Sequence, residues 1–202
     1  MRRAIASKSG LITTFGAFVS AFILSLSAHA EPIVMKTNTF AAVFNDVAKR
    51  ANFDKSATLQ ECRKVVFSAC LYSISDNTKI VVGGKADDAP RSIAVVTLKK
   101  EQTIPAVFTA EDAQIWPLIV QIANPDIPVE QRTQLVDRFN AMLKAGQSTF
   151  TTKLGSIRYS AAAAPEMGIW MIANLKSVLS PSTWFKDWRQ KVKGWITEAR
   201  AK

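Results

Sequence analysis

The sequence predicts an α+β protein in which helices pack on an antiparallel sheet. Segments with apolar residues three or four positions apart alternate with short segments rich in β-branched and aromatic residues. The turns between neighbouring strand segments are short, as antiparallel pairing requires. The content of 48% apolar and 21% charged residues is that of an ordinary globular protein. The predicted order is a helix, three strands, one or two helices, two or three strands and a last helix.

Residues 1–30 have the three parts of a secretory signal peptide. Arg2, Arg3 and Lys8 form a basic start, an apolar stretch follows at 10–26, and small residues flank His29 at Ala28 and Ala30. Cleavage after Ala30 predicts an exported, periplasmic protein with a net charge of +7 instead of +10. The alternative is an uncleaved N-terminal anchor, although an apolar run of about 17 residues is short for a membrane span.

Residues 31–202 then form one predicted domain. Its first eight residues look extended, and a helix follows that Thr39 can cap, with Phe40, Val43, Phe44 and Val47 on its apolar side. Residues 51–64 are ambiguous and partly helical. Residues 65–74, 79–82 and 91–100 are predicted strands of an antiparallel meander, because they are rich in β-branched and aromatic side chains and are joined by short turns.

The second half of the domain begins with two helices. Thr109 with Asp112 three positions later has the pattern of a capping box, and Pro128 is placed to start a second helix that ends at Gly146. Residues 148–153, 157–162 and 167–175 are predicted strands. Ser180 with Pro181 begins the last helix. The element order resembles that of the type III secretion chaperone fold, but no sequence motif supports this resemblance. That group is typically acidic and cytoplasmic, so a role as an effector chaperone is not implied.

The residues that could perform chemistry are few. The only histidine is His29, so cleavage leaves a chain without a Ser-His-Asp triad, a Cys-His pair or a histidine-based metal site. We find no catalytic residue, cofactor-binding motif or metal-ligating motif. Carboxylates could still act in pairs, but only Asp87–Asp88, in a predicted turn, and Glu111–Asp112, at a predicted helix start, are adjacent.

The two cysteines, Cys62 and Cys70, have two interpretations. An oxidising compartment favours a disulfide between them. A single strand or a single helix through both would hold the Cα atoms about 26 Å or about 12 Å apart, whereas a disulfide needs about 7 Å or less. The chain must therefore turn between the cysteines, for instance with a helix that ends near Lys64 and folds back onto a strand. Two buried free thiols are the alternative.

Residues 182–202 form the most informative segment of the mature chain. Trp184, Trp188 and Trp195 fall on one helical stripe, and six basic residues, Lys191 among them, accompany two acidic ones. One interpretation is a terminal helix that docks this stripe on the sheet. The other is a surface made by Trp184, Trp188, Lys191 and Trp195 that binds an anionic membrane or a groove in a partner protein.

These observations lead to three functional hypotheses. The first is an exported binding, interaction or chaperone-like protein whose ligand and oligomeric state are unknown. The second is a peripheral envelope protein held at the membrane by its last helix. The third is a carboxylate-dependent hydrolase. Nucleic acid is the least favoured partner, because the basic residues are dispersed and the protein is predicted to be exported.

Overall fold

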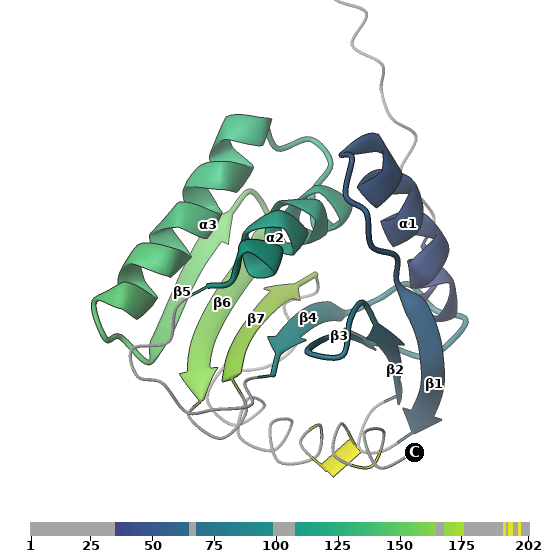
Figure 1. Ribbon diagram of the computed structural model, residues 1–202. Helices are drawn as coiled ribbons and strands as arrows, with labels where there is room; N and C mark the ends of the chain where they lie inside the picture. Colours follow the sequence, from purple (N-terminus) through teal and green to yellow (C-terminus); the bar gives the residue numbers. More distant parts are fainter. Residues whose placement is uncertain are drawn as a thin grey trace, which may run out of the picture. The chain divides into compact units, whose positions relative to one another are not determined.

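The computed structural model describes residues 35–64, 68–98, 108–164 and 168–175, and also residues 192, 194, 195 and 198. All of them belong to the second of the two units into which the chain divides, Pro32–Lys202. Within it, helices α1 (Phe40–Arg50), α2 (Ala110–Ala123) and α3 (Val129–Lys144) lie over one face of a seven-stranded sheet (Figure 1). The predicted α+β class is therefore confirmed.

All neighbouring strands of the sheet are antiparallel. The spatial order is β1-β2-β3-β4-β7-β6-β5. The strands are β1 (Thr58–Lys64), β2 (Ser68–Ser73), β3 (Thr78–Gly83), β4 (Ser92–Thr97), β5 (Thr149–Leu154), β6 (Ile157–Ala164) and β7 (Gly168–Asn174). The first four strands form a meander that ends in the middle of the sheet. Helices α2 and α3 then lead to the opposite edge, and β7 returns to pair with β4.

Local sequence signals explain where the helices begin and end. The Asp112 backbone N–H donates to the Thr109 hydroxyl at 3.1 Å, and the Thr109 N–H donates to the Asp112 carboxylate at 2.8 Å, which confirms the capping box of α2. Helix α3 follows Pro128, and Gly146 takes a positive φ of 79° just after its end. A short 3-10 turn, Thr37–Thr39, precedes α1 where we expected extended chain.

The main core fills the space between the three helices and the sheet. Phe44 of α1, Trp116 of α2 and Phe139 of α3 are fully buried there, against apolar residues from the sheet. The Phe139 ring lies edge-to-face with Trp116, and with Phe150 of β5, at centroid distances of 6.2 Å and 5.1 Å. These contacts fix α3 over the β5–β6 hairpin. Gly155, with a φ of 60°, forms the turn of that hairpin.

The prediction for residues 51–64 was wrong in part. Ala51 and Asn52 form the turn that ends α1, and residues 58–64 are not helical but form β1, so the meander has four strands instead of three. β1 lies at an edge and is mostly exposed, which is why its sequence lacks the apolar alternation of a half-buried strand. The other predicted strands are confirmed within a few residues at each end, except that residues 65–67, 99–100 and 167 lie outside the described residues.

Candidate functional site

A second apolar cluster covers the face of the sheet opposite the three helices. The strands β2, β3, β4 and β7 supply most of it, with Ala69, Leu71, Val81, Ala94, Val96, Trp170 and Ile172, and Leu98 adds to it just after β4. Val192 and Trp195, from the C-terminal segment, complete the cluster and are each only 4% exposed. We call these ten residues the outer cluster. A sheet that is apolar on both faces needs a cover on both, and the chain's own C-terminal residues contribute to the second one.

A β-bulge in β1 directs polar side chains toward this cluster. Leu59 pairs with Tyr72, but the register then shifts by one residue at Gln60, so that Glu61 pairs with Leu71. Tyr72 belongs to the main core and Leu71 to the outer cluster. Since alternate residues of a strand point to opposite faces, the extra residue moves Glu61 onto the face that carries Trp195.

Polar contacts join β1 to Trp195 and Glu198 of the C-terminal segment. The Trp195 indole Nε1–H donates to Glu61 Oε1, and Arg63 forms ion pairs of 2.7 Å both with Glu198 and, within β1, with Glu61. The Arg63 guanidinium carbon also lies 5.8 Å from the centroid of the Trp195 ring. Hydrogen bonds from Arg63 to Glu198 and then to Glu61 raise the pKa of the guanidinium. We call Glu61, Arg63, Trp195 and Glu198 the β1 clamp.

The structure places the predicted surface residues as follows. Trp195 is buried on the sheet, which is the position that the docking interpretation requires. Trp184, Trp188 and Lys191 lie outside the described residues. The sequence did not indicate that Trp195 meets Glu61 and Arg63, because more than 130 residues separate the partners and β1 was not recognised as a strand. The alternation of Glu61 and Arg63 around Cys62 was the only local signal.

Cys62 and Cys70 form a disulfide, which was the first of our two interpretations. They lie directly opposite each other on β1 and β2, with Cα atoms 4.0 Å apart. The two cysteines lie on two antiparallel strands, and Cys62 is not on a helix that ends near Lys64, as we had suggested; residues 65–67, between the strands, lie outside the described residues. The bulge at Gln60 matters here too: without it, the register of Leu59 with Tyr72 would place Glu61 opposite Cys70.

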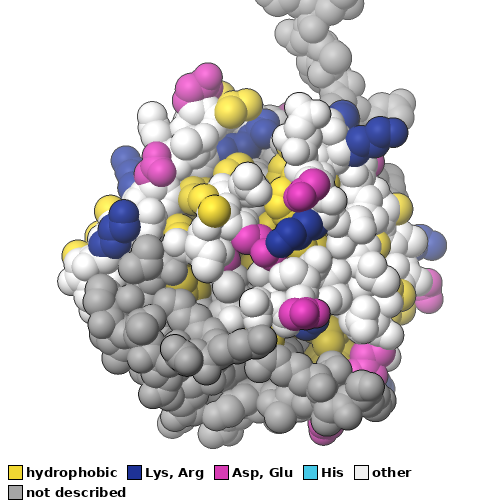
Figure 2. Space-filling view, viewed as in Figure 1, with side chains coloured by type: hydrophobic (Ala, Val, Ile, Leu, Met, Phe, Trp, Pro, Cys, Tyr) yellow, Lys and Arg dark blue, Asp and Glu magenta, His cyan; other side chains and the backbone are white. Residues whose placement is uncertain are grey.

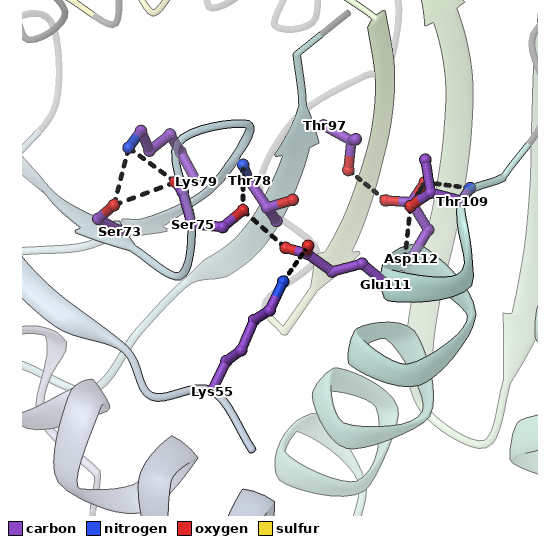
Figure 3. A network of polar contacts seen from close by, with 9 residues as sticks. All are labelled: Lys55, Ser73, Ser75, Thr78, Lys79, Thr97, Thr109, Glu111 and Asp112. Carbon is purple, nitrogen blue, oxygen red and sulfur yellow. Dashed lines mark hydrogen bonds and ion pairs between the residues drawn. The ribbon is translucent and has the colours of Figure 1, made fainter. Parts of the chain in front are cut away.

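Glu111 and Asp112 are adjacent at the start of α2, but they bind different partners in the polar network there (Figure 3). Glu111 accepts hydrogen bonds from Lys55 and, at 2.8 Å, from the Ser75 hydroxyl. Burial raises the pKa of Glu111, but the hydrogen bonds from Lys55, Ser75 and Thr78 outweigh burial and lower it overall. The pair of Glu111 with Lys55 thereby ties the segment before β1 to the start of α2.

Asp112 points the other way and is fully buried. Its carboxylate accepts hydrogen bonds from the Thr97 hydroxyl and from the N–H and hydroxyl of Thr109, at 2.8 and 2.9 Å for the latter two. Burial raises the pKa of Asp112, against these hydrogen bonds, which lower it. The two acids therefore do not face each other across a shared space, as the two carboxyl groups of a glycoside hydrolase do.

The second adjacent pair, Asp87 and Asp88, lies in a turn as predicted. The Asn38 side-chain amide donates to Asp87 Oδ1 at 3.2 Å, and the Thr37 N–H donates to the Asp88 carbonyl oxygen at 3.0 Å. These two hydrogen bonds join the turn that holds the two acids to the 3-10 turn before α1. Within the described part of the chain, no three His, Cys, Asp or Glu side chains gather in the way a metal site needs.

On the helix side of the molecule, charges of both signs are mixed. Figure 2 shows Lys and Arg next to Asp and Glu over the coloured surface, with apolar side chains visible between them. None of the helices that the structure describes is both long and apolar enough to span a membrane. Comparison with protein-family models, with curated proteins and with solved structures finds no match to this chain.

Proposed function

We propose that this protein is exported and acts in the periplasm by binding, as a small interaction or chaperone-like module. The observation that carries the proposal is that three buried or partly buried acidic side chains are bound by other residues of the protein. Glu61, Glu111 and Asp112 each bind side chains of the protein's own fold. These contacts support a binding role over a carboxylate-dependent hydrolase, which needs acids that are free to act on a substrate.

A peripheral envelope protein is the second candidate. The segment 182–202 has six basic and two acidic residues, a balance that attracts anionic lipid headgroups. Trp195 is already used in the β1 clamp, so membrane contact would fall to other residues of the segment, such as Trp184, Trp188 and Lys191. An uncleaved N-terminal segment would be a different route to the same location.

Fractionation of cells that produce the full chain tests both candidates. We expect the protein in the osmotic-shock fraction, with Glu31 as the first residue by mass spectrometry. Recovery in the membrane pellet with release by high salt supports the second candidate instead. Lys191→Glu should then weaken membrane binding more than Lys85→Glu, a matched change at an exposed loop residue. An intact Met1 on the protein contradicts export with cleavage.

Affinity purification of the tagged protein from envelope extract addresses the binding role. We expect a protein partner that is retained in stoichiometric amount and survives a salt wash. Recovery of the protein alone, from extracts with and without crosslinking, contradicts the proposal.

A further inference from the structure

The two edge strands of the sheet differ in how well they could accept another strand. β1 has the bulge at Gln60, and its side chains Glu61 and Arg63 are engaged in the β1 clamp. Bulges and charged side chains of this kind disfavour pairing at an edge. β5 has a regular register with β6 over its whole length, no proline, and Lys153 as its one charged residue. β5 is therefore the edge on which strand pairing is least hindered.

The free backbone groups of β5 can be identified from its pairing with β6. The Ala163 N–H donates to the Ser148 carbonyl at 3.0 Å, and in the register of the hairpin Ser148 stands opposite Ala163. In antiparallel pairs, every second residue bonds to the neighbouring strand, and the residues between them direct N–H and C=O the other way. Thr149, Thr151 and Lys153 therefore present their backbone groups at the outer edge of β5, where none of the other described strands pairs with them. Their side chains are exposed on the outer face.

We propose that two copies of this chain pair through β5 around a twofold axis, which joins the two sheets into one. This proposal goes beyond the binding role proposed above and does not depend on it. Only one antiparallel register lets Thr149, Thr151 and Lys153 all bond to the second copy while the outer faces of the two sheets lie on the same side. Thr151 then stands opposite Thr151 of the second copy, and Thr149 stands opposite Lys153 of the second copy.

The charges on β5 fit a second copy of the chain. In this register the two Lys153 side chains lie at opposite ends of the paired strands, so they do not repel each other across the axis, and the central pair is uncharged. Lys153 already stands opposite Arg158 on β6. Like charges directly opposite each other destabilise a pair of strands. A cation opposite Lys153 on the second copy would therefore be unfavourable, but the proposed register places Thr149 there, which is uncharged. One strand per copy makes a small interface, so we expect a weak dimer.

Sedimentation equilibrium of the purified protein, over a range from about 10 µM to about 1 mM, tests this pairing. We expect a monomer–dimer equilibrium in this range. Thr149→Glu places a carboxylate opposite Lys153 twice and should tighten the dimer, and Thr149→Lys should weaken it, each by about 2- to 30-fold in Kd. Thr151→Lys puts two cations on the axis and should abolish the dimer. Thr58→Lys makes the same change on the β1 edge and should leave the Kd unchanged.

Thermal unfolding of each variant separates loss of pairing from loss of fold. Thr151→Lys also removes the contact of the Thr151 hydroxyl with Ser160, 3.1 Å away, so its unfolding must be compared with that of the parent protein. Thr149→Glu is expected to tighten the dimer, and damage to the fold would not produce a tighter dimer. A protein that stays monomeric up to about 1 mM overturns the proposal. A dimer whose Kd responds equally to Thr149→Glu and Thr149→Lys, or responds to Thr58→Lys, overturns the β5 register.

Discussion

At the scale of single residues, Glu111 and Asp112 show how neighbouring carboxylates can take opposite roles. Both lie in the first turn of α2, but Glu111 faces a lysine and Asp112 faces two threonines. An ammonium group favours the ionised carboxylate. Burial without a cation disfavours it, and hydroxyl and amide hydrogen bonds compensate only in part. The sequence pattern of the capping box predicts the pairing with Thr109, but the contact with Thr97 depends on the tertiary fold.

The opposite pKa directions lead to opposite pH dependences of stability. The pKa of Glu111 is lowered from 4.5, so the folded state gains stability from its charge at neutral pH and loses it as the pH falls through this region. The pKa of Asp112 is raised from 3.8, so the folded state binds its proton more readily than the unfolded state and gains stability as the pH falls. Urea unfolding from pH 7 to pH 3 should show both effects in matched variants.

For Glu111→Gln we expect the stability deficit relative to the parent protein to shrink as the pH falls below about 4.5. For Asp112→Asn we expect the deficit to grow as the pH falls toward about 3.8 and then to level off, because only the parent protein loses an unfavourable buried charge. Parallel pH profiles for the two variants would contradict the assignment of opposite roles.

Because of its hydrogen bonds, Asp112 should be one of the acids whose removal lowers the free energy of unfolding most. Asp112→Ala leaves the buried Thr97 hydroxyl and the partly buried Thr109 N–H without their acceptor and removes half of the capping box. We expect a loss of about 3 kcal/mol in the free energy of unfolding, measured by urea titration. Asp126→Ala, at an exposed loop residue, is the control and should cost less than about 0.5 kcal/mol. Equal losses in both variants would argue against the buried network.

At the scale of elements, β1 marks the limit of what the sequence could predict. Buried strands such as β4 were recognised because Ile93, Val95 and Val96 are apolar and β-branched. β1 has no such pattern, since its exposed face needs no apolar residues and the bulge at Gln60 interrupts its alternation. What makes it a strand is the pairing with β2, together with the disulfide. Tertiary pairing of this kind overrides weak local propensity.

The disulfide should stabilise the β1–β2 hairpin mainly through the unfolded chain. It links residues that are 8 positions apart, and closing a loop of that length corresponds to about 2.5 kcal/mol in the chain-entropy model. We expect the Cys62→Ala, Cys70→Ala variant to fold but to lose about 2–3 kcal/mol in urea unfolding. Reductant should reduce the stability of the parent protein similarly and leave the variant unchanged. A parent protein whose two thiols react with a labelling reagent under denaturing, non-reducing conditions would contradict the bond.

At the scale of the whole molecule, Val192 and Trp195 pack on the face of the sheet opposite the three helices. The tryptophan stripe and the basic residues of 182–202 were visible in the sequence, but its two interpretations could not be separated there. An amphipathic stripe has the same spacing whether it packs on a sheet or on a membrane. For Trp195 the difference lies in the partners, Glu61 and Arg63, which only the folded chain brings to the same place.

Substitution of Trp195 measures how strongly this docking holds the fold. Trp195→Ala removes a ring that is 4% exposed and should lower the free energy of unfolding by about 3–5 kcal/mol. Trp195→Phe keeps most of the packing on the outer cluster but cannot donate to Glu61, and should cost about 1–2 kcal/mol. Leu59→Ala, at a 41% exposed position of β1, is the control and should cost less than about 1 kcal/mol. If Trp195→Ala unfolds at the same urea concentration as the parent protein, the segment is not docked in solution, and its tryptophans are then available for the membrane or partner contact.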